Sequence, residues 1–241
     1  MCTALAELRR ALAAAPARPG WYPGSHDRVR HARERHPAAA EAVGGTPART
    51  LLTGLDLHDP AESAFTTEYF APVLGEAELP GTGEGFLAAA VAAANDRLHG
   101  TLGANIILHP ATRRALGKSF EHHITALHYG TIGINAWTGV GYLTPYATWG
   151  ALPGHTADDI QSGIGVVHNA LLLGDAERTV VTGSFRPVPR SLLHGEWAIS
   201  PKPPWFVDNE TAATTGRRLA SFASRPRPTA LPGVFASALR G

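Results

Sequence analysis

Residues Leu102–Asn135, LGANIILHPATRRALGKSFEHHITALHYGTIGIN, decide the fold that this chain is expected to adopt. The first apolar run predicts a strand over Leu102–His109, and the last predicts a strand over Gly130–Asn135. Between them a helix is predicted over Ala111–His128, because apolar side chains recur at helical spacing along one side: Leu116, Phe120, Ile124 and Leu127. This order predicts two parallel strands joined by a right-handed helical crossover.

The segments on either side extend the alternation of strands and helices. Upstream, Pro72–Leu79 predicts a strand and Glu84–Arg97 predicts an alanine-rich helix, and downstream Arg178–Gly183 predicts a late strand. Two further helices are predicted near the N-terminus, over Thr3–Ala15 and Asp27–Ala42. We therefore expect the α/β fold class, with a mainly parallel sheet and crossover helices.

Two segments lack a regular hydrophobic period. Ala136–His155 is rich in glycine, proline and aromatic residues, which predicts a long loop of the kind that often carries function. Ser184–Gly241 is dense in proline, which resists regular structure and predicts an extended tail on the surface. Three aromatic residues are expected to anchor this tail: Trp197, Trp205 and Phe206. The expected division is a domain over 1–183 and a C-terminal tail over 184–241.

Composition excludes several classes of protein. The chain has 241 residues with 44% hydrophobic and 17% charged residues, which suits a folded protein with a buried core. Its formal net charge of +1 gives no electrostatic case for a nucleic-acid partner. No apolar run approaches the roughly 20 residues that span a bilayer, so we expect no membrane partner and a cytoplasmic location. The single cysteine, Cys2, excludes an internal disulfide.

Four motifs stand in a fixed order along the sequence. They are Glu68-Tyr69-Phe70-Ala71-Pro72-Val73; Ala94-Asn95-Asp96 followed by Gly100-Thr101-Leu102; Tyr129-Gly130-Thr131-Ile132-Gly133-Ile134-Asn135; and Trp149-Gly150 with Gln161-Ser162-Gly163-Ile164-Gly165. In this order, they resemble the second half of an NAD(P)-dependent aldehyde dehydrogenase. The resemblance covers about Thr3 to Gly183.

This resemblance implies a cofactor site and an oligomerisation strand. Glu68 would bind the ribose hydroxyls of NAD or NADP, since a carboxylate can accept two hydrogen bonds and so fix the ribose. Phe70 would pack near the nicotinamide ring. Val180 and Val181 would lie in the late strand that extends a partner subunit's sheet, so a homo-oligomer is expected.

The resemblance also implies a reaction and a substrate pocket. The expected activity is oxidation of a small aldehyde to a carboxylic acid, as a C-terminal fragment or subunit of such an enzyme. Asn135, which ends a predicted strand, is expected near the substrate, and Trp137 and His155 are further candidates to line the pocket.

The family's nucleophile is the main departure. Its reaction needs a thiol, a glutamate base and an N-terminal cofactor domain, all upstream of the region that the resemblance covers. Cys2 stands directly before the first predicted helix and lacks the strand that follows the family's cysteine loop. A complementing N-terminal polypeptide is therefore an expected partner. Two alternatives remain open: an inactive interaction partner of a full-length relative, or acid–base chemistry by His155, Asp158 or Glu68.

The twelve histidines do not predict a metal centre. His26, His31 and His36 are spaced by five residues, which spreads them around a helix, and the adjacent His122 and His123 point apart. A metal site needs several ligands that converge on one point. We expect no metal in this protein.

Overall fold

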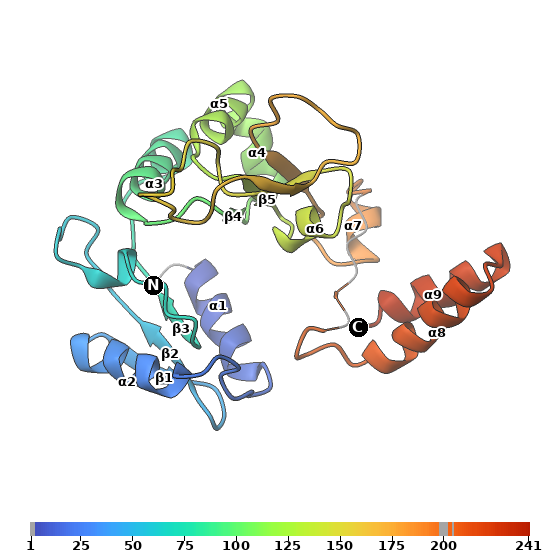
Figure 1. Cartoon of the computed structure of the whole chain (residues 1–241), viewed down its shortest axis with the longest axis horizontal. Coiled ribbons are helices and arrows are strands. Elements are labelled where there is room, and N and C mark those ends of the chain that lie inside the picture. Colours follow the sequence, from blue (N-terminus) through green and yellow to red (C-terminus); the bar gives the residue numbers. More distant parts are fainter. Residues whose placement is uncertain (1–2, 198–201, 204) are drawn as a thin grey trace. The chain divides into compact units, whose positions relative to one another are not determined.

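A computed structural model gives the structure of residues 3–197, 202–203 and 205–241. Within these residues the chain is a mixed α/β protein with three small sheets, which confirms the predicted class at that level. The chain divides into two units (Figure 1): Met1–Leu55, Glu68–Ala77 and Ser200–Gly241 form the first unit, and Asp56–Thr67 and Glu78–Ile199 form the second. The candidate nucleophile Cys2 lies outside the described residues.

A three-stranded parallel sheet forms the centre of the second unit. Its strands are β4 (Gly103–Ile106), β5 (Thr131–Ile134) and β8 (Thr179–Thr182), in the order β4-β5-β8. Both pairs are parallel, as predicted from the strand–helix–strand pattern. The central strand β5 is buried along its whole length because both of its faces are covered.

Helices α3 (Gly83–Arg97) and α5 (Lys118–Ala126) cover one face of this sheet. Apolar side chains from these helices and from β5 make the core of the unit: Val91, Phe120, Ile124, Leu127, Tyr129, Ile132 and Ile134. The short 3-10 helix η1 (Ser63–Phe65) belongs to the same unit, where the Phe65 carbonyl accepts a hydrogen bond from the His99 amide. The helical period in the sequence thus identified the face that is buried.

The helix predicted over Ala111–His128 is two helices, so this prediction is wrong in one respect. α4 (Pro110–Leu116) ends at Gly117, and α5 begins directly after it. Gly117 has φ of 54° and ψ of −130°, a conformation that L-residues with a side chain rarely adopt. The glycine therefore turns the chain between two short helices.

The other face of the sheet is covered by a segment that was expected to be a loop. Residues 136–155 contain α6 (Gly139–Tyr142) and β6 (Thr148–Gly150), and β6 pairs antiparallel with β7 (Val166–His168). At Gly130 a Cβ atom would lie 2.1 Å from the carbonyl oxygen of Gly150, so only glycine lets these backbones approach so closely. The partner of β6 lies beyond the predicted loop, which is why no local pattern revealed it.

The first unit contains a second small sheet with two helices. Its elements are α1 (Thr3–Ala14), α2 (Ser25–Arg35), β1 (Ala40–Val43), β2 (Arg49–Leu52) and β3 (Val73–Gly75). β2 lies in the middle, antiparallel to β1 and parallel to β3. The helix predicted over Asp27–Ala42 is wrong beyond Arg35, because Pro37 disfavours helical geometry at the preceding His36.

The segment predicted to be an extended tail is partly helical, so that prediction is wrong. It contains α7 (Arg190–Leu193), α8 (Ala212–Ser224), the 3-10 helix η2 (Pro228–Ala230) and α9 (Leu231–Ala238). Those of its prolines that the structure describes lie before or between helices or, as Pro228 and Pro232 do, in a first turn where no amide donor is needed. Trp197 and Trp205 are 78% and 53% exposed, so they do not anchor it by burial. The division at residue 183 stays a prediction.

Candidate functional site

The predicted cofactor residues lie in the first unit, just before β3. The Glu68 side chain is exposed and the Phe70 ring is 50% exposed, so both can reach a ligand. Phe70 has φ of 45°, a left-handed conformation that is uncommon for an aromatic residue. Its ring meets Tyr22 edge-on with centroids 5.1 Å apart, and Arg28 Nη2 donates to its carbonyl oxygen at 3.3 Å. The backbone at Phe70 is therefore held by neighbouring side chains.

A groove of about 300 Å³ lies in the same unit between α1 and the sheet. Its lining is mostly apolar: Leu12, Val43, Arg49, Thr50, Leu51, Pro72, Val73 and Leu74. The guanidinium of Arg49 donates to the carbonyl oxygens of Leu12, Ala15 and Pro16 at 2.7–3.1 Å and so closes the end of α1. The groove is chemically suited to an apolar or aromatic group.

Asn135, predicted as the last residue of a strand, directly follows β5, and its side chain forms hydrogen bonds with the backbone. Its Oδ1 accepts from the Leu108 amide at 2.8 Å, and its Nδ2 donates to the Leu108 carbonyl at 2.8 Å. The amide side chain thus continues the pairing of β4 with β5 by one step. Asn135 also has φ of 51°, which asparagine tolerates better than most residues. This residue fixes the loop that follows β4.

Trp137 follows Asn135 and lies at the surface with 40% of its area exposed. Its ring lies over Gly139, where a Cβ atom would come within 2.3 Å of ring carbons. The backbone amide of Thr138 donates to Asn105 Oδ1 at 3.0 Å and fixes the turn. Trp137 is positioned to present an aromatic face to solvent.

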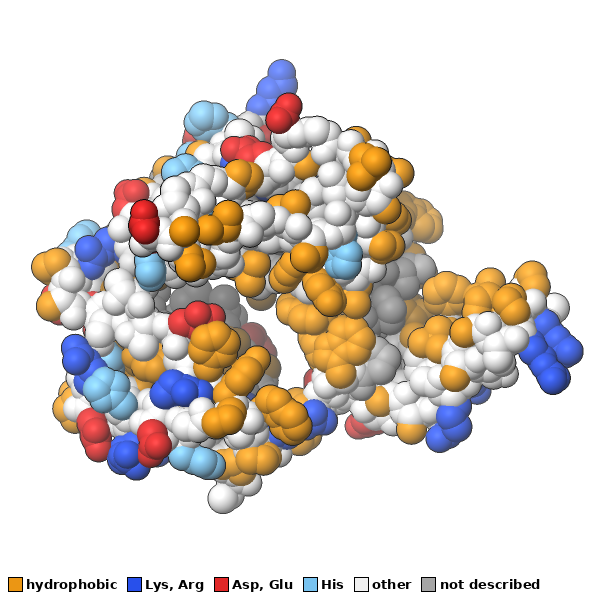
Figure 2. Space-filling view, viewed as in Figure 1, with side chains coloured by type: hydrophobic (Ala, Val, Ile, Leu, Met, Phe, Trp, Pro, Cys, Tyr) orange, Lys and Arg blue, Asp and Glu red, His pale blue; other side chains and the backbone are white. Residues whose placement is uncertain are grey.

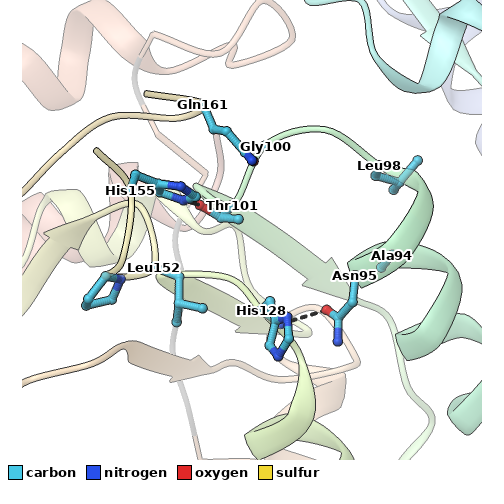
Figure 3. A pocket seen from close by; sticks show the side chains of 10 residues that line it. Ala94, Asn95, Leu98, Gly100, Thr101, His128, Leu152, His155 and Gln161 are labelled. Carbon is cyan, nitrogen blue, oxygen red and sulfur yellow. Dashed lines mark hydrogen bonds between the residues drawn. The ribbon is translucent and has the colours of Figure 1, made fainter. Parts of the chain in front are cut away.

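His155, the third predicted pocket residue, lies on the edge of a real pocket of about 230 Å³ (Figure 3). Its Nε2 is 2.6 Å from Thr101 Oγ1, a short hydrogen bond between an imidazole and a hydroxyl. Ser162 Oγ accepts from the backbone amide of Thr101 at 2.8 Å. The loop after β6 therefore holds Thr101 through two side chains, His155 at its hydroxyl and Ser162 at its backbone amide.

Several other residues complete this pocket: Ala94, Asn95, Leu98, Gly100, His128, Leu152, Pro153 and Gln161. Asn95 is a structural member, since it accepts from the His128 amide at 2.8 Å and donates to the Ala126 carbonyl at 2.8 Å. The His128 side chain is exposed at the edge of the pocket. The lining is thus mainly polar, with two imidazoles, a hydroxyl and the side-chain amides of Asn95 and Gln161 beside a few apolar residues.

The three predicted substrate residues are not brought together. Thr101 and His128 precede β4 and β5, so the pocket that contains His155 lies at the amino ends of these parallel strands. Asn135 and Trp137 follow the carboxyl end of β5. A four-residue strand separates these ends by roughly 13 Å. The sequence could not reveal this, because His155 lies in a loop whose course depends on β6 and β7.

A charged cluster at the carboxyl end of the sheet was missed by sequence reasoning. Arg186 Nη1 pairs with Glu196 Oε1 at 2.7 Å, and Arg186 Nη2 lies 3.1 Å from His109 Nε2. The Glu196 carboxylate also accepts from the backbone amide of Phe185. The hydrogen bond from Arg186 and then these backbone donors lower the pKa of Glu196 below its ordinary 4.5, although partial desolvation opposes the shift. The residues come from three separate segments, so no local motif marked them.

Within the part of the chain that the structure describes, no group of three or more histidine, cysteine, aspartate or glutamate side chains is arranged to hold a metal ion. The helices of that part include none with the length and apolar character to cross a membrane. Comparisons with models of protein families, with curated proteins and with solved structures find no match to this chain.

Proposed function

We propose that this chain supplies the C-terminal part of an NAD(P)-dependent aldehyde dehydrogenase, acting with a thiol nucleophile that residues 3–241 do not contain. The observation that carries the proposal is the order of the motifs on their elements. The Glu68 motif leads into β3, Ala94-Asn95-Asp96 lies in the last turn of α3, Asn135 follows β5, and the late strand is β8. The resemblance implies an asparagine at the end of a strand and a later strand that follows it, and these two placements support the proposal.

The residues at the expected cofactor site fit a nicotinamide nucleotide. Glu68 would accept hydrogen bonds from the ribose hydroxyls, and the half-exposed Phe70 ring would pack against the nicotinamide. When bound, the cofactor would supply a hydride acceptor. Asn135 would act indirectly, because its amide is hydrogen-bonded to Leu108 and so fixes the loop after β4.

Cofactor binding tests this proposal. We expect NADH or NADPH to bind with a change in nucleotide fluorescence, and Glu68→Gln to weaken binding about tenfold through the loss of charged hydrogen bonds to the ribose. Glu78→Gln, at another exposed carboxylate, is the matched control. Aldehyde oxidation, followed as NAD(P)H formation with wild type and Cys2→Ala, then tells whether the chain turns over alone. Equal loss of binding in both glutamate variants would contradict the assignment of Glu68.

An inactive role as an oligomerisation partner of a full-length aldehyde dehydrogenase is the alternative. β8 lies at the edge of its sheet, and Val180 on this strand is 46% exposed, which leaves an edge available for another chain. A change in mass on mixing with such an enzyme, without turnover by this chain, would favour this alternative.

Acid–base catalysis at the pocket is a second candidate function, favoured by the 2.6 Å contact between His155 Nε2 and Thr101 Oγ1. His155 could take the proton of the Thr101 hydroxyl as its oxygen attacks the acyl carbon of an ester. The imidazolium would then protonate the departing alcohol, and His155 would activate a water molecule that hydrolyses the acyl–threonine ester. Hydrolysis of p-nitrophenyl acetate that depends on both residues tests it.

A further inference from the structure

The C-terminal hairpin, defined here as residues 211–241, has an unusual distribution of charge. It contains five arginines and no lysine, aspartate or glutamate: Arg217, Arg218, Arg225, Arg227 and Arg240. Its side chains therefore carry a formal charge of +5, and because the whole chain is +1, the preceding 210 residues carry −4. The net charge of the chain conceals this strongly basic segment.

Two antiparallel helices, α8 and α9, form the hairpin (Figure 1). Thr215, Val234 and Ser237 are buried between the helices. Thr211 Oγ1 donates to the Ser237 carbonyl at 2.7 Å, and Arg218 Nη1 donates to the Gly233 carbonyl. Helices of 13 and 8 residues are too short to be stable alone in water, so this segment gains from packing on a further surface.

The outer surface of the hairpin combines positive charge with apolar side chains. All five arginines are exposed, and Leu219 and Phe235 are 44% and 52% exposed. Figure 2 shows hydrophobic side chains along the hairpin and arginine side chains at its far end. Arg217 donates to Thr214 Oγ1, but among the described residues no carboxylate forms an ion pair with a hairpin arginine.

We propose that the C-terminal hairpin binds the surface of a membrane that contains anionic phospholipids. Each arginine near such a surface raises the partition coefficient about fivefold, since the negative potential acts on all of them together. An exposed ion pair with a single carboxylate of a protein strengthens binding by about fivefold at most and often by nothing. Five arginines that form no ion pair within the described residues therefore gain more from a continuous anionic surface than from scattered acidic side chains.

The exposed apolar residues favour lipid over nucleic acid. Leu219 and Phe235 can insert at the boundary between headgroups and acyl chains, while the arginine side chains extend to the phosphates. Phosphate contacts to nucleic acid would leave the Leu219 side chain in water. A contact of this kind lies on the membrane and does not cross it, so it revises the expectation of no membrane partner, which rested on the absence of a spanning run.

Co-sedimentation with lipid vesicles tests the proposal on the full chain. We expect binding to vesicles of phosphatidylcholine with phosphatidylserine, much weaker binding to phosphatidylcholine alone, and weakening as salt shortens the Debye length. The triple variant Arg217→Gln, Arg225→Gln and Arg227→Gln keeps the bond from Arg218 to Gly233 and should lower the partition coefficient roughly 100-fold. Adding Leu219→Gln to the triple variant should lower the partition coefficient a further fewfold.

The matched control removes three exposed arginines outside the hairpin: Arg10→Gln, Arg30→Gln and Arg114→Gln. It has the same net charge as the hairpin variant but should bind nearly as well as wild type. Circular dichroism establishes that both variants fold. Equal loss in the two triple variants, or equal binding to neutral and anionic vesicles, would overturn the proposal. Tighter binding to an RNA or DNA oligonucleotide than to anionic vesicles would overturn it as well.

Discussion

Arg178 Nη1 lies 2.6 Å from the carbonyl oxygen of Leu127, and this contact joins the start of β8 to the end of α5. The same atom donates to the carbonyls of Thr125 at 2.8 Å and Ile124 at 3.2 Å. These carbonyls are at the C-terminal end of a helix, where the i+4 amide donors of the helix interior are missing and the helix dipole is negative. One guanidinium thus caps a helix and connects it to a strand 51 residues later.

Arg178→Ala should destabilise the second unit by about 2–3 kcal/mol, because three hydrogen bonds from a charged donor to the end of α5 are lost. The Arg178 side chain is only 12% exposed, so water cannot readily replace it. Arg178→Lys should recover part of the loss, since one ammonium keeps the charge but not the geometry of the fork. Urea unfolding followed by circular dichroism measures both variants.

Arg114→Ala is the control for Arg178, since Arg114 is exposed on α4. A surface substitution of this kind should change stability by no more than about 0.5 kcal/mol. Equal stability of the Arg178→Ala and Arg114→Ala variants would show that the three carbonyl contacts add nothing to the folded state.

Asn135 has two separable structural roles, and two substitutions distinguish them. Asn135→Ala removes both hydrogen bonds to Leu108. It also puts alanine, which adopts left-handed backbone conformations less readily than asparagine, at a φ of 51°. We therefore expect the free energy of unfolding to fall by about 2–3 kcal/mol. Asn135→Gly removes the same bonds but relieves the left-handed backbone, so its loss should be about 1 kcal/mol smaller. Thermal unfolding measures the difference, and a more stable Ala variant would contradict the backbone argument.

Glu196 should make stability depend on pH in a defined direction. Arg186 and backbone donors hold the pKa of Glu196 below 4.5 in the folded state. The unfolded chain binds the proton more tightly, so the contribution of Glu196 is complete above pH 4.5 and is lost as pH falls through the folded-state pKa. Wild type should therefore be more stable than Glu196→Gln at pH 7, and the gap should close in acid. A gap that is constant between pH 7 and pH 3 would refute this, and Glu78→Gln serves as the control.

The parts of the fold that the sequence predicted are those specified by local patterns. The alanine-rich composition identified α3 nearly to the residue, and the apolar runs identified β4 and β5. The ends of helices inside longer helical patterns were harder to predict, although Gly117 and Pro37 are residues that commonly end a helix. The prediction missed α8 because the many prolines of 184–241 were taken to prevent helices throughout the segment, whereas α8 itself contains no proline.

The candidate sites depended on contacts between distant segments. Thr101 and His155 are 54 residues apart, and neither residue's own neighbourhood indicates that they meet. Arg186 and His109 are 77 residues apart. Asn135 was selected through the family resemblance, and its place after an apolar run follows from local pattern. To predict such side-chain pairs, one needs the register of the strands and the path of the loops, and local sequence patterns determine neither.

The Thr101–His155 pair predicts hydrolysis of an activated ester. We expect p-nitrophenyl acetate to be cleaved faster by wild type than by His155→Gln, with a loss of about 100-fold or more in kcat/KM if His155 acts as the general base. Thr101→Val, which keeps the shape but removes the hydroxyl, should lose a similar factor, whereas Thr101→Ser should retain activity.

His128→Gln is the matched control, because His128 lies at the same pocket without a contact to the Thr101 hydroxyl. It should hydrolyse the ester at nearly the wild-type rate. After a brief reaction, mass spectrometry should find an acetyl group on the peptide that contains Thr101 in wild type and not in Thr101→Val. Equal rates for the His155 and His128 variants would indicate hydrolysis by surface imidazoles and exclude the pair as a catalytic unit.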